Sequence, residues 1–524
     1  MSARTLTIGG SPYPLILPNI RDPRLHVAAV IITVHVLGQV GLGFRVSVPQ
    51  ILAAILTCAV LEVALTFRQS KAFVWPASAM LTGSGVALIL RVVGMRPGDP
   101  WSTDALPLFA GIAGLSLLSK YVIRYRGSHV FNPSNVGLVV AFIVLGSSRV
   151  EPLDFWWAPM NAWMLAAYAV ILVGGLLITR RLHLLPLAAS FWLVFAAGLG
   201  LLAGSDHCMT ANWAFAPVCG ADYWRTVVLS PEVLIFLFFM ITDPKTVPAG
   251  AVGRIVFGGL VAILSVLLMA PQTDEFGSKV GLLAGLVVVC AARPLLDRLV
   301  PQPGSDEDDP RRFLSNVARG GSPAARAARA SLAAIAVLAV GAGIVAAGTP
   351  ARGTIVPNVS EVLNRPPAVV DPATLPAITV GQDVVDFDQR LAASGMSEVV
   401  VTLAQNLELE NQALLRGDET LLAAIDHGDR LAEMQGRLGD ARAGGRVQVI
   451  HYRFDAIDAS LLVPFGRQTG LSLGLASTGT MTRETYDAEG GLLDSESSPF
   501  NLTFAMRQVT GERWLNVAVL PATP

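Results

Sequence analysis

Charged residues are scarce in this sequence of 524 residues, since Asp, Glu, Lys and Arg together make up 15% of it. Soluble domains usually contain about a quarter charged residues, and the deficit is concentrated before residue 300. No basic stripe interleaved with aromatic residues is present, so nucleic acid is not an expected partner. The chain also lacks a Cys-x-x-Cys pair, a Gly-x-Gly-x-x-Gly fingerprint and a Gly-x-x-x-x-Gly-Lys loop. We therefore expect no metal site and no oxidation of NADH by this chain alone, and no set of catalytic residues is predicted.

Long apolar segments dominate the first two thirds of the sequence, and hydrophobic residues make up 52% of the chain. A membrane-spanning helix needs roughly 20 apolar residues. The pattern predicts a polytopic α-helical membrane protein, in which the segments near 134 and 226 are short or interrupted. Because a polar, proline-rich stretch precedes the first segment, we expect a retained span rather than a cleaved signal peptide. The eleven predicted spans lie at about 25–44, 48–66, 75–93, 105–123, 134–148, 160–178, 182–203, 226–242, 252–270, 278–300 and 331–348.

Lys and Arg residues predict the orientation of these spans. With a cytoplasmic N-terminus, the cytoplasmic segments hold roughly three times as many Lys and Arg residues as the opposite loops. We therefore expect a multi-pass protein of the bacterial inner membrane whose C-terminal region is extracytoplasmic. Cys208 and Cys219 share a predicted external loop, where a disulfide is favoured over two free thiols. Cys58 and Cys290 lie in apolar spans and are expected to be packing residues.

Four regions are predicted along the chain. Residues 1–300 form a ten-span membrane domain, in two halves of five spans, and an odd number per half makes the second half an inverted repeat of the first. Residues 301–330 form a charged cytoplasmic linker, acidic at first and then basic, and residues 331–348 form the eleventh span. Residues 354–524 are expected to fold as a soluble, extracytoplasmic α+β domain. Apolar residues there recur at three- and four-residue steps up to about 437 and then alternate, which indicates helices followed by antiparallel strands.

Glycine and proline interrupt the membrane region at matching places in its two halves. In the first half Trp75-Pro76 leads into Thr82–Gly85, as Ser230-Pro231 leads into Thr242–Lys245 in the second half. After an apolar segment, Phe131–Leu138 follows in the first half and Phe276–Leu282 in the second. Proline lacks an N–H and disfavours helix in the residue before it. Irregular backbone at membrane depth is tolerated only where protein or a watery cavity covers it. Matching interruptions therefore predict discontinuous helices around one site near the bilayer midplane, framed by Phe131–Asn135 and Thr242–Pro248.

Two of these motifs resemble a known family of membrane proteins. Gly127, Phe131-Asn132-Pro133-Ser134 and the span after them match a Gly-x-x-x-Phe-Asn-Pro-Ala/Ser pattern. Thr242–Pro248 and the later Gly253-Arg254 match a Thr-Asp-Pro-x-Thr/Ser-x-Pro pattern with a Gly-Arg start to the next span. Over about residues 25–300 the chain is similar to the D-type component of Rnf electron-transport complexes and the B-type component of Na⁺-translocating NADH:quinone reductases. Polytopic relatives of that family also occur in gene clusters for enediyne antibiotics.

The resemblance implies a membrane component of an electron-transfer or ion-coupling complex that works with partner redox subunits in the lipid bilayer. It also implies a flavin, FMN or riboflavin. Flavin-bearing family members attach FMN to the last Thr of a Ser/Thr-Gly-Ala-Thr motif, which this sequence lacks. The similar string Ser477–Thr480 has no Ala and lies in a predicted strand. Any flavin is therefore expected to be bound noncovalently.

The expected cofactor-binding residues all belong to the two motifs. They carry amide, hydroxyl, imidazole or carboxylate groups that suit a flavin edge, a phosphate or a cation; the alternative is that they only cap two half-helices. His129 would relay protons near neutral pH or be structural. Asp243 is costly in a span unless it is functional or paired, with Lys245 or Arg254 as candidate partners. The set is His129, Asn132, Ser134, Asn135, Thr242, Asp243 and Thr246.

Glu62 is the other acid inside a predicted span, and either a pair with Arg91 or a place on an ion path would explain it. Three functions stay open on the sequence alone. The first is a membrane component of an electron-transfer or ion-coupling complex. The second is a transporter of a small solute, or an accessory protein of an enediyne-type biosynthetic cluster, built on the same fold. The third is a scaffold whose external domain recruits a partner.

Overall fold

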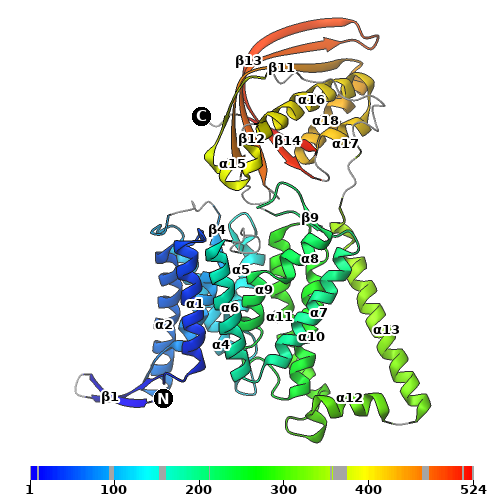
Figure 1. Cartoon of the computed structure of the whole chain (residues 1–524). Helices are drawn as coiled ribbons and strands as arrows, with labels where there is room; N and C mark the ends of the chain where they lie inside the picture. Colours follow the sequence, from blue (N-terminus) through cyan, green and yellow to red (C-terminus); the bar gives the residue numbers. More distant parts are fainter. Residues whose placement is uncertain are drawn as a thin grey trace. The chain divides into compact units, whose positions relative to one another are not determined.

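The computed structural model divides into two compact units that are described separately (Figure 1). The membrane unit comprises Met1–Met209 and Cys219–Arg352, and the C-terminal unit comprises Thr210–Val218, Gly353–Pro464 and Gln468–Pro524. Residues 354–356 and 358–374, at the start of the predicted C-terminal domain, lie outside the described residues. The structure describes residues 2–8, 11–93, 99–152, 161–211, 213–320, 322–353, 357, 375–392, 394–462, 471–509 and 513–521.

All eleven predicted spans coincide with apolar helices. Within the described residues, eight helices have the length and composition to cross a membrane, and three are shorter. This confirms a multi-pass helical membrane protein. The eight are α1 (Pro23–Val40), α2 (Val48–Ser70), α6 (Ala162–Arg181), α7 (Leu185–Ala203), the interrupted helix Gly220–Met240, α10 (Ala251–Met269), α11 (Glu275–Leu299) and α13 (Pro323–Ala347). The three are α3 (Ala77–Ile89), α4 (Leu106–Val122) and α5 (Pro133–Leu145).

The eighth span is broken, as the sequence predicts. It consists of α8 (Gly220–Val228), α9 (Pro231–Ile235) and the π-helix η1 (Phe236–Met240). Ser230 caps α9 by accepting a hydrogen bond from the Val233 amide at 3.2 Å, and the proline that follows fits the first helical position,. In the π-helix the Ile241 amide donates to the Phe236 carbonyl at 3.0 Å, five residues earlier. Such wide turns occur often at functional sites.

The two halves of the membrane unit repeat one packing pattern. In the first half α2 packs against α3 and α4, and α4 packs against α5; in the second half α7 packs against α8 and α10, and α10 packs against α11. Across the halves, α1 contacts α6 and α5 contacts α11. Glycine permits the closest approaches, because a Cβ on Gly83 would lie 2.5 Å from the Ala54 carbonyl oxygen and one on Gly258 would lie 2.5 Å from that of Leu187,.

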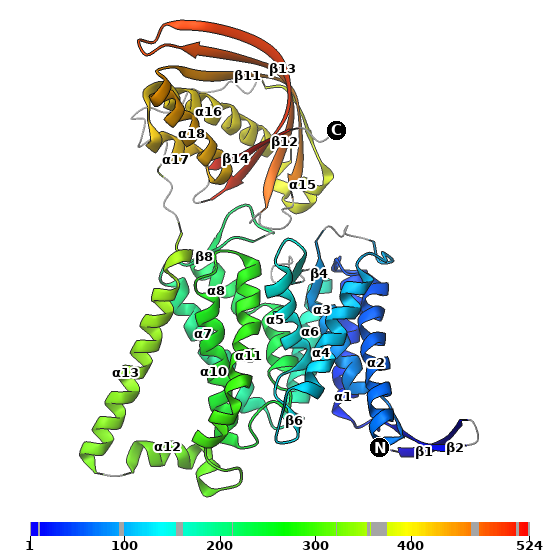
Figure 2. The same cartoon turned by 180° about the vertical axis from the view of Figure 1, so that it is seen from behind.

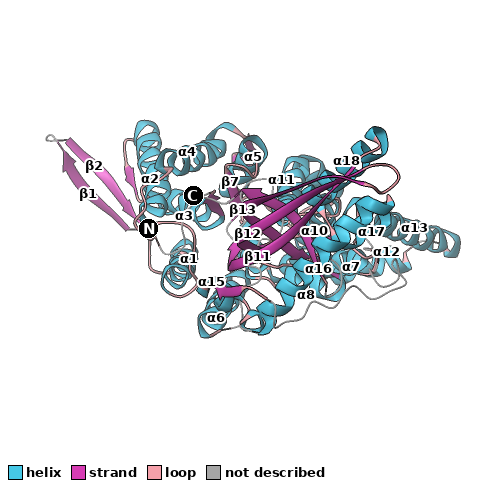
Figure 3. Ribbon diagram, turned by 90° about the horizontal axis from the view of Figure 1, so that it is seen from above, coloured by secondary structure: helices cyan, strands magenta, loops and turns pink. Residues whose placement is uncertain are grey.

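Short strands connect several of these helices. The N-terminal hairpin, which the sequence pattern did not predict, extends away from the helices (Figure 3). Its strands β1 (Ser2–Ile8) and β2 (Ser11–Leu17) form a sheet with β3 (Phe73–Val74). The other pairs are β4 (Leu90–Val92) with β7 (Val150–Pro152), β5 (Arg124–Tyr125) with β6 (Ser128–His129), and β8 (Cys208–Met209) with β9 (Val218–Cys219).

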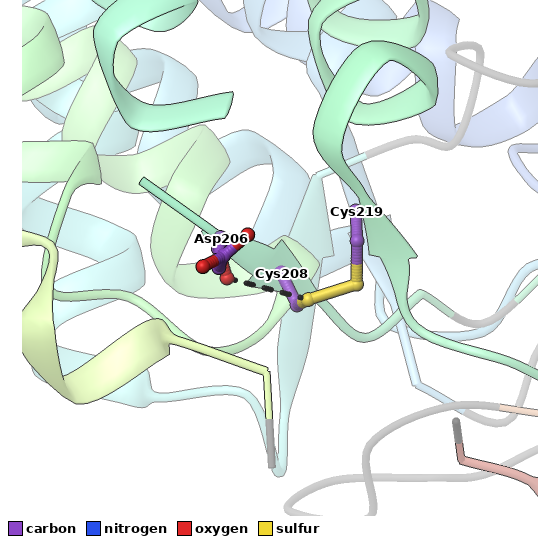
Figure 4. The surroundings of a disulfide bond; sticks show 3 residues. All are labelled: Asp206, Cys208 and Cys219. Carbon is purple, nitrogen blue, oxygen red and sulfur yellow. Dashed lines mark hydrogen bonds between the residues drawn. A yellow bond between two sulfur atoms is a disulfide. The ribbon is translucent and has the colours of Figure 1, made fainter. Parts of the chain in front are cut away.

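The last of these strand pairs carries the predicted disulfide. Cys208 and Cys219 are bonded, and Cys58 and Cys290 are free and buried, so the prediction for all four cysteines is confirmed (Figure 4). The loop inside the disulfide, Thr210–Val218, folds as part of the C-terminal unit. Its Phe215 ring lies 4.9 Å from the Phe387 ring and 5.0 Å from the Trp514 ring, between centroids.

The C-terminal unit has helices followed by a mainly antiparallel sheet, which confirms the predicted α+β class. The sheet order is β10-β11-β12-β13-β14, with only β10 and β11 parallel. The string Ser477–Thr480 lies inside β12, as expected. The helices are α15 (Gln382–Phe387), the 3₁₀ turn η5 (Gln389–Leu391), α16 (Ser394–Arg416), α17 (Glu419–Ile425) and α18 (Gly428–Gly444). The strands are β10 (Ala377–Val380), β11 (Val447–Leu462), β12 (Ser472–Tyr486), β13 (Leu492–Gln508) and β14 (Trp514–Pro521).

The linker between the tenth and eleventh spans is more ordered than its charged sequence suggests. It contains the 3₁₀ turn η2 (Asp306–Asp308) and the helix α12 (Pro310–Arg319). The last membrane helix, α13, begins at Pro323 rather than near 331, because Ser322 caps it and alanine-rich sequence with good helix propensity continues into the apolar segment,. A 3₁₀ turn, η3 (Thr349–Ala351), follows.

Candidate functional site

The first half contributes the loop between β6 and α5 to the candidate site. His129 ends β6, and Asn132 is the N-cap of α5. Asn132 Oδ1 accepts hydrogen bonds from the Asn135 amide at 3.2 Å and from Ser134 Oγ at 2.9 Å. Asparagine at the N-cap and proline at the first helical position are both strongly favoured, so the Asn-Pro sequence itself sets this helix start.

The second half contributes the turn that follows the π-helix. Asp243 Oδ1 accepts a hydrogen bond from the Lys245 amide at 3.0 Å, which is an Asx turn,. The Asp243 carbonyl accepts from the amide and the hydroxyl of Thr246, each at 3.1 Å. The Thr242 hydroxyl donates to the Phe238 carbonyl at 2.5 Å. The Thr-Asp-Pro motif therefore ends the helix and holds one carboxylate oxygen of Asp243 in the turn.

These two segments meet although more than a hundred residues separate them. His129 Nε2 lies 3.0 Å from Asp243 Oδ2. Asn132 Nδ2 donates to the Met240 carbonyl at 3.2 Å, at the end of the π-helix. Asn135 Nδ2 donates to the Leu283 carbonyl in α11 at 3.0 Å. Side-chain amides of the first half thus hydrogen-bond backbone carbonyls of the second half.

A cavity of about 370 Å³ lies where the segments meet. His129, Asn132, Ser134, Thr242 and Asp243 line it, whereas Asn135 and Thr246 of the predicted set do not. Asn135 instead hydrogen-bonds the Leu283 carbonyl and so joins α5 to α11. Thr246 hydrogen-bonds the Asp243 carbonyl and stabilises the turn that contains Asp243. The volume falls in the range of about 300–1,000 Å³ that is usual for small-molecule sites. Five of the seven predicted residues therefore share one cavity.

The rest of the lining is mostly apolar, with three further charged residues. Phe238, Phe239 and Met240 contribute apolar wall from the π-helix, and Leu81 and Leu88 contribute it from α3. The charged groups are Asp22 and Arg24 at the start of α1, with Lys245 from the turn. Arg24 Nη2 donates to Asp22 Oδ2 at 2.6 Å.

The partner of Asp243 differs from both sequence candidates. Its carboxylate contacts the His129 ring and the Lys245 backbone amide, whereas Arg254 donates to the carbonyls of His183 at 3.1 Å and Pro248 at 3.2 Å. The sequence did not indicate His129 as the partner, because the pairing depends on how the two halves dock.

Of the two explanations left open for Glu62, the pair with Arg91 is wrong, because Glu62 contacts Lys120 and Tyr121 instead. Lys120 Nζ lies 2.8 Å from Glu62 Oε1, and the Tyr121 hydroxyl donates to Glu62 Oε2 at 2.5 Å. Arg91 pairs instead with Glu151, its neighbour across the β4–β7 ladder. Glu62 does not line the cavity described above.

Lys279 is a buried charge inside a membrane helix. It lies in α11 and is 4% exposed, with Nζ 2.6 Å from Glu275 Oε1 one helical turn earlier and 3.7 Å from Glu232 Oε1. A buried acid paired four residues before it allows this lysine to remain inside an apolar helix.

Several cavity residues went unnoticed in the sequence. Asp22-Pro23-Arg24 carries a helix-start signal, Asp at the N-cap and Pro at the next position, that was available but points only to a helix,. The π-helix residues Phe238 and Met240 have no sequence signature that sets them apart from an ordinary apolar helix. Gly85 lines the cavity as well, and a Cβ there would lie 3.1 Å from Ser134 Oγ.

Comparison with known proteins gives a distant similarity. No protein-family model matches the chain. The chain is 24% identical over 246 residues to the D component of the ion-translocating oxidoreductase complex of Escherichia coli. The alignment covers 36% of this chain and 66% of that relative, just under two thirds of its length. This similarity is distant, and it points to the same family that the Asn-Pro and Thr-Asp-Pro motifs resemble.

Proposed function

We propose that the membrane unit is a membrane component of an electron-transfer or ion-coupling complex, and that it works with partner redox subunits. The observation that carries the proposal is the cavity at the His129–Asp243 contact, where broken segments from both halves meet. The distant similarity to the D component of an ion-translocating oxidoreductase complex supports it. A membrane protein that breaks two helices at one cavity leaves backbone and side-chain polar groups facing that cavity, as ligand sites in membrane proteins require.

We further propose that the two halves are inverted repeats. The repeated packing of α2 with α3 and α4, and of α7 with α8 and α10, supports this interpretation. So does the pairing of equivalent helices across the halves, α1 with α6 and α5 with α11, which a two-fold relation would produce,. With the bias of Lys and Arg, the same proposal places the N-terminus in the cytoplasm of a bacterial cell and the C-terminal unit outside the inner membrane.

The cavity residues fit a flavin held without a covalent bond. An isoalloxazine ring has an apolar benzenoid side and a hydrogen-bonding pyrimidine side. The cavity offers an apolar wall at Phe238 and Phe239 and polar groups at His129, Asn132 and Asp243. Gly85 leaves space beside Ser134 that a side chain would fill. Arg24 and Lys245, which also line the cavity, suit the phosphate of FMN,.

A bound flavin would supply one- or two-electron redox chemistry at this place. The residues of the chain would bind and orient it. Asn132 is held by Met240 and Ser134, so its amide stays fixed at the cavity wall. His129 Nε2 lies 3.0 Å from Asp243 Oδ2, and this pair would hydrogen-bond a ligand at the edge of the cavity,.

An absorption spectrum of the purified full-length protein, followed by acid release of bound flavin, tests the proposal. We expect flavin at close to one per chain, released without a covalent protein adduct. Asn132→Ala and Asp243→Asn are expected to lose the flavin while the protein still inserts. Asp222→Asn serves as the matched control, because Asp222 is exposed on α8 and makes only a local pair with Arg225. A flavin-free wild-type protein would rule the flavin out.

A second candidate function is transport of a small solute, such as the product of an enediyne-type cluster. A smaller cavity of about 40 Å³, bounded by Glu232 and Lys279, shares four lining residues with the large one. The four are Leu88, Ile89, Ile235 and Met240, all apolar, and two of them adjoin or belong to the π-helix. In a transporter, apolar side chains that separate two neighbouring cavities would form the closed part of a passage. Solute uptake by vesicles that contain flavin-free protein would favour this candidate, and polyketide genes beside its gene would support the cluster role.

A further inference from the structure

The helix α12 (Pro310–Arg319) divides cleanly into an apolar and a basic face. At 100° per residue, one arc of the helix carries Pro310, Phe313, Leu314, Val317 and Ala318,. The opposite arc carries Arg311, Arg312, Ser315, Asn316 and Arg319. No acidic residue occurs between 310 and 330. A short helix with this division is typical of segments that lie in the plane of a membrane surface.

The apolar arc is exposed. Leu314 is 65% exposed and Val317 is 45% exposed, and Phe313 is half-buried. Among the described elements, α12 packs against the turn η2 and against α10 and α13, which leaves its apolar arc largely uncovered. Exposed apolar side chains on one face of a helix indicate contact with an apolar phase.

The acidic stretch before α12 is already engaged in local structure. Asp308 Oδ1 accepts from the Val252 amide at the start of α10 at 3.1 Å. Asp309 caps α12 by accepting from the Arg311 and Arg312 amides, at 2.8 and 3.1 Å. The amide hydrogen bonds from Arg312 and Arg311 lower the pKa of Asp309, which keeps it charged as a cap. Asp306 pairs with Arg312 at 2.6 Å. Asp308 and Asp309 therefore hydrogen-bond the first turns of α10 and α12, and Asp306 pairs with Arg312. None of these contacts involves the side chains of Arg311 and Arg319 on the polar arc.

The position of α12 places the bilayer within reach. Figures 1 and 2 show α12 running across the ends of α10 and α13 instead of alongside them, within the membrane unit. It ends at Arg319, and α13 begins at Pro323. Only 6% of the apolar window of α13 is buried by protein, which leaves its apolar surface open to contact with lipid,. The apolar segment of α13 begins near residue 331, about two helical turns after Pro323, so α12 lies next to the end of α13 that leads into the bilayer,.

We propose that α12 is an interfacial helix that binds anionic lipid. Phe313, Leu314 and Val317 insert at the boundary of the acyl chains, and Arg311 and Arg319 contact phosphate headgroups. The apolar occupant is the bilayer itself, because the neighbouring helix α13 is already lipid-facing. The inference depends only on the membrane unit being embedded in lipid, and it holds for either function proposed above.

Site-directed spin labelling of the full-length protein in nanodiscs tests the insertion. The native free thiols, Cys58 and Cys290, are buried and the other two cysteines are bonded, so a label attaches to an introduced cysteine. A nitroxide at Leu314→Cys should be more accessible to oxygen than to a water-soluble nickel chelate. The matched label at Ser315→Cys, on the polar arc, should show the reverse. Equal access of the chelate to both positions would mean that α12 lies in water. A Leu314 label that neither reagent reaches would mean that protein covers it, and either outcome overturns the proposal.

Lipid composition tests the headgroup contact. Amide hydrogen exchange of α12 should be slower, on the order of tenfold, in nanodiscs with phosphatidylglycerol than in phosphatidylcholine alone. The double variant Arg311→Gln/Arg319→Gln should lose this difference. Arg442→Gln, at an exposed arginine of the C-terminal unit, should keep it. Identical exchange of wild-type α12 in both lipids would overturn the recognition of anionic headgroups.

Discussion

Both units of the protein bury charged side chains, but they arrange them differently. In the membrane unit the His129–Asp243 pair faces a cavity of about 370 Å³. In the C-terminal unit Glu410 and Arg430 are each 3% exposed and bonded to each other, with Arg430 Nε 2.9 Å from Glu410 Oε1. Asn516 of β14 donates to Glu410 at 2.9 Å and to Asp426 at 3.2 Å. One arrangement leaves polar atoms beside a space that a ligand can enter, and the other joins two helices to a strand.

This difference indicates what each cluster is for. A buried ion pair that is enclosed by partners adds little net stability but is costly to break, so it specifies one packing of α16, α18 and β14. A pair at a cavity wall keeps the freedom to exchange a proton or a hydrogen bond with a ligand. Charge removal is therefore expected to affect folding in the C-terminal unit and binding in the membrane unit.

Loss of Arg430 should give the largest effect. Arg430→Met leaves Glu410 and Asp426 buried without their cation and is expected to destabilise the C-terminal unit by about 3–5 kcal/mol. Hydrogen exchange of α16, α18 and β14 in the full-length protein measures this. The control is Arg442→Met, on the same helix as Arg430. It removes an exposed pair with Glu419 of α17 and should cost less than about 1 kcal/mol,. Equal effects of the two variants would show that the Glu410–Arg430–Asn516 cluster does not hold α16, α18 and β14 together.

Phe215→Ala tests where the boundary between the two units lies. Phe215 belongs to the disulfide-closed loop, yet it is 8% exposed in the core of the C-terminal unit beside Phe387 and Trp514. Its truncation should destabilise that unit by about 3 kcal/mol, seen as faster exchange in α15 and β14. Phe67→Ala, which removes an aromatic contact with Tyr13 and Phe73 in the membrane unit, should leave that exchange unchanged. Unchanged exchange in Phe215→Ala would assign the loop to the membrane unit alone.

Asp243→Asn should separate binding from folding in the membrane unit. The amide keeps the shape and a hydrogen bond to His129, so the unfolding free energy should change by no more than about 1 kcal/mol. Flavin retention, in contrast, should be lost with the negative charge. Thermal unfolding in detergent and flavin content of the same preparation give the two readouts. If the variant keeps its flavin, Asp243 does not take part in binding. If the variant fails to fold, the His129–Asp243 pair is needed for the structure of the membrane unit.

The smallest effect is expected from pH acting on Asp426. Burial first, and then the charge of Glu410, raise the pKa of Asp426 well above 3.8 in the folded C-terminal unit. The folded state then binds the proton more tightly than the unfolded state. This contribution to stability is complete below pH 3.8 and is lost as the pH rises through the folded pKa,. Hydrogen exchange of the unit across this range should show a steeper decline in wild type than in Asp426→Asn. Parallel declines would mean that Asp426 is charged in the folded unit.

Much of the architecture was predictable, because it depends on local pattern. Apolar length predicted the eight helices that are long enough to cross a membrane and the three shorter apolar helices, and alternation after residue 445 predicted the strands β11–β14,. Asn132-Pro133 and Ser230-Pro231 gave two helix starts, since capping acts within four residues,. The disulfide followed from two cysteines in one short loop. The strand pair β1–β2 was missed, because its proline-containing sequence masks the alternation.

The sequence by itself determined where the chain spans the membrane, where its helices break and which residues are candidates for the site, because spacing along the chain carries that information. Only the tertiary structure decided which candidates meet. It paired Asp243 with His129 and Glu62 with Lys120, and it placed Phe215 in the core of the C-terminal unit. The physical reason is that each of these contacts joins residues more than fifty positions apart. Their partners are fixed by how helices dock, and no local propensity reports that docking.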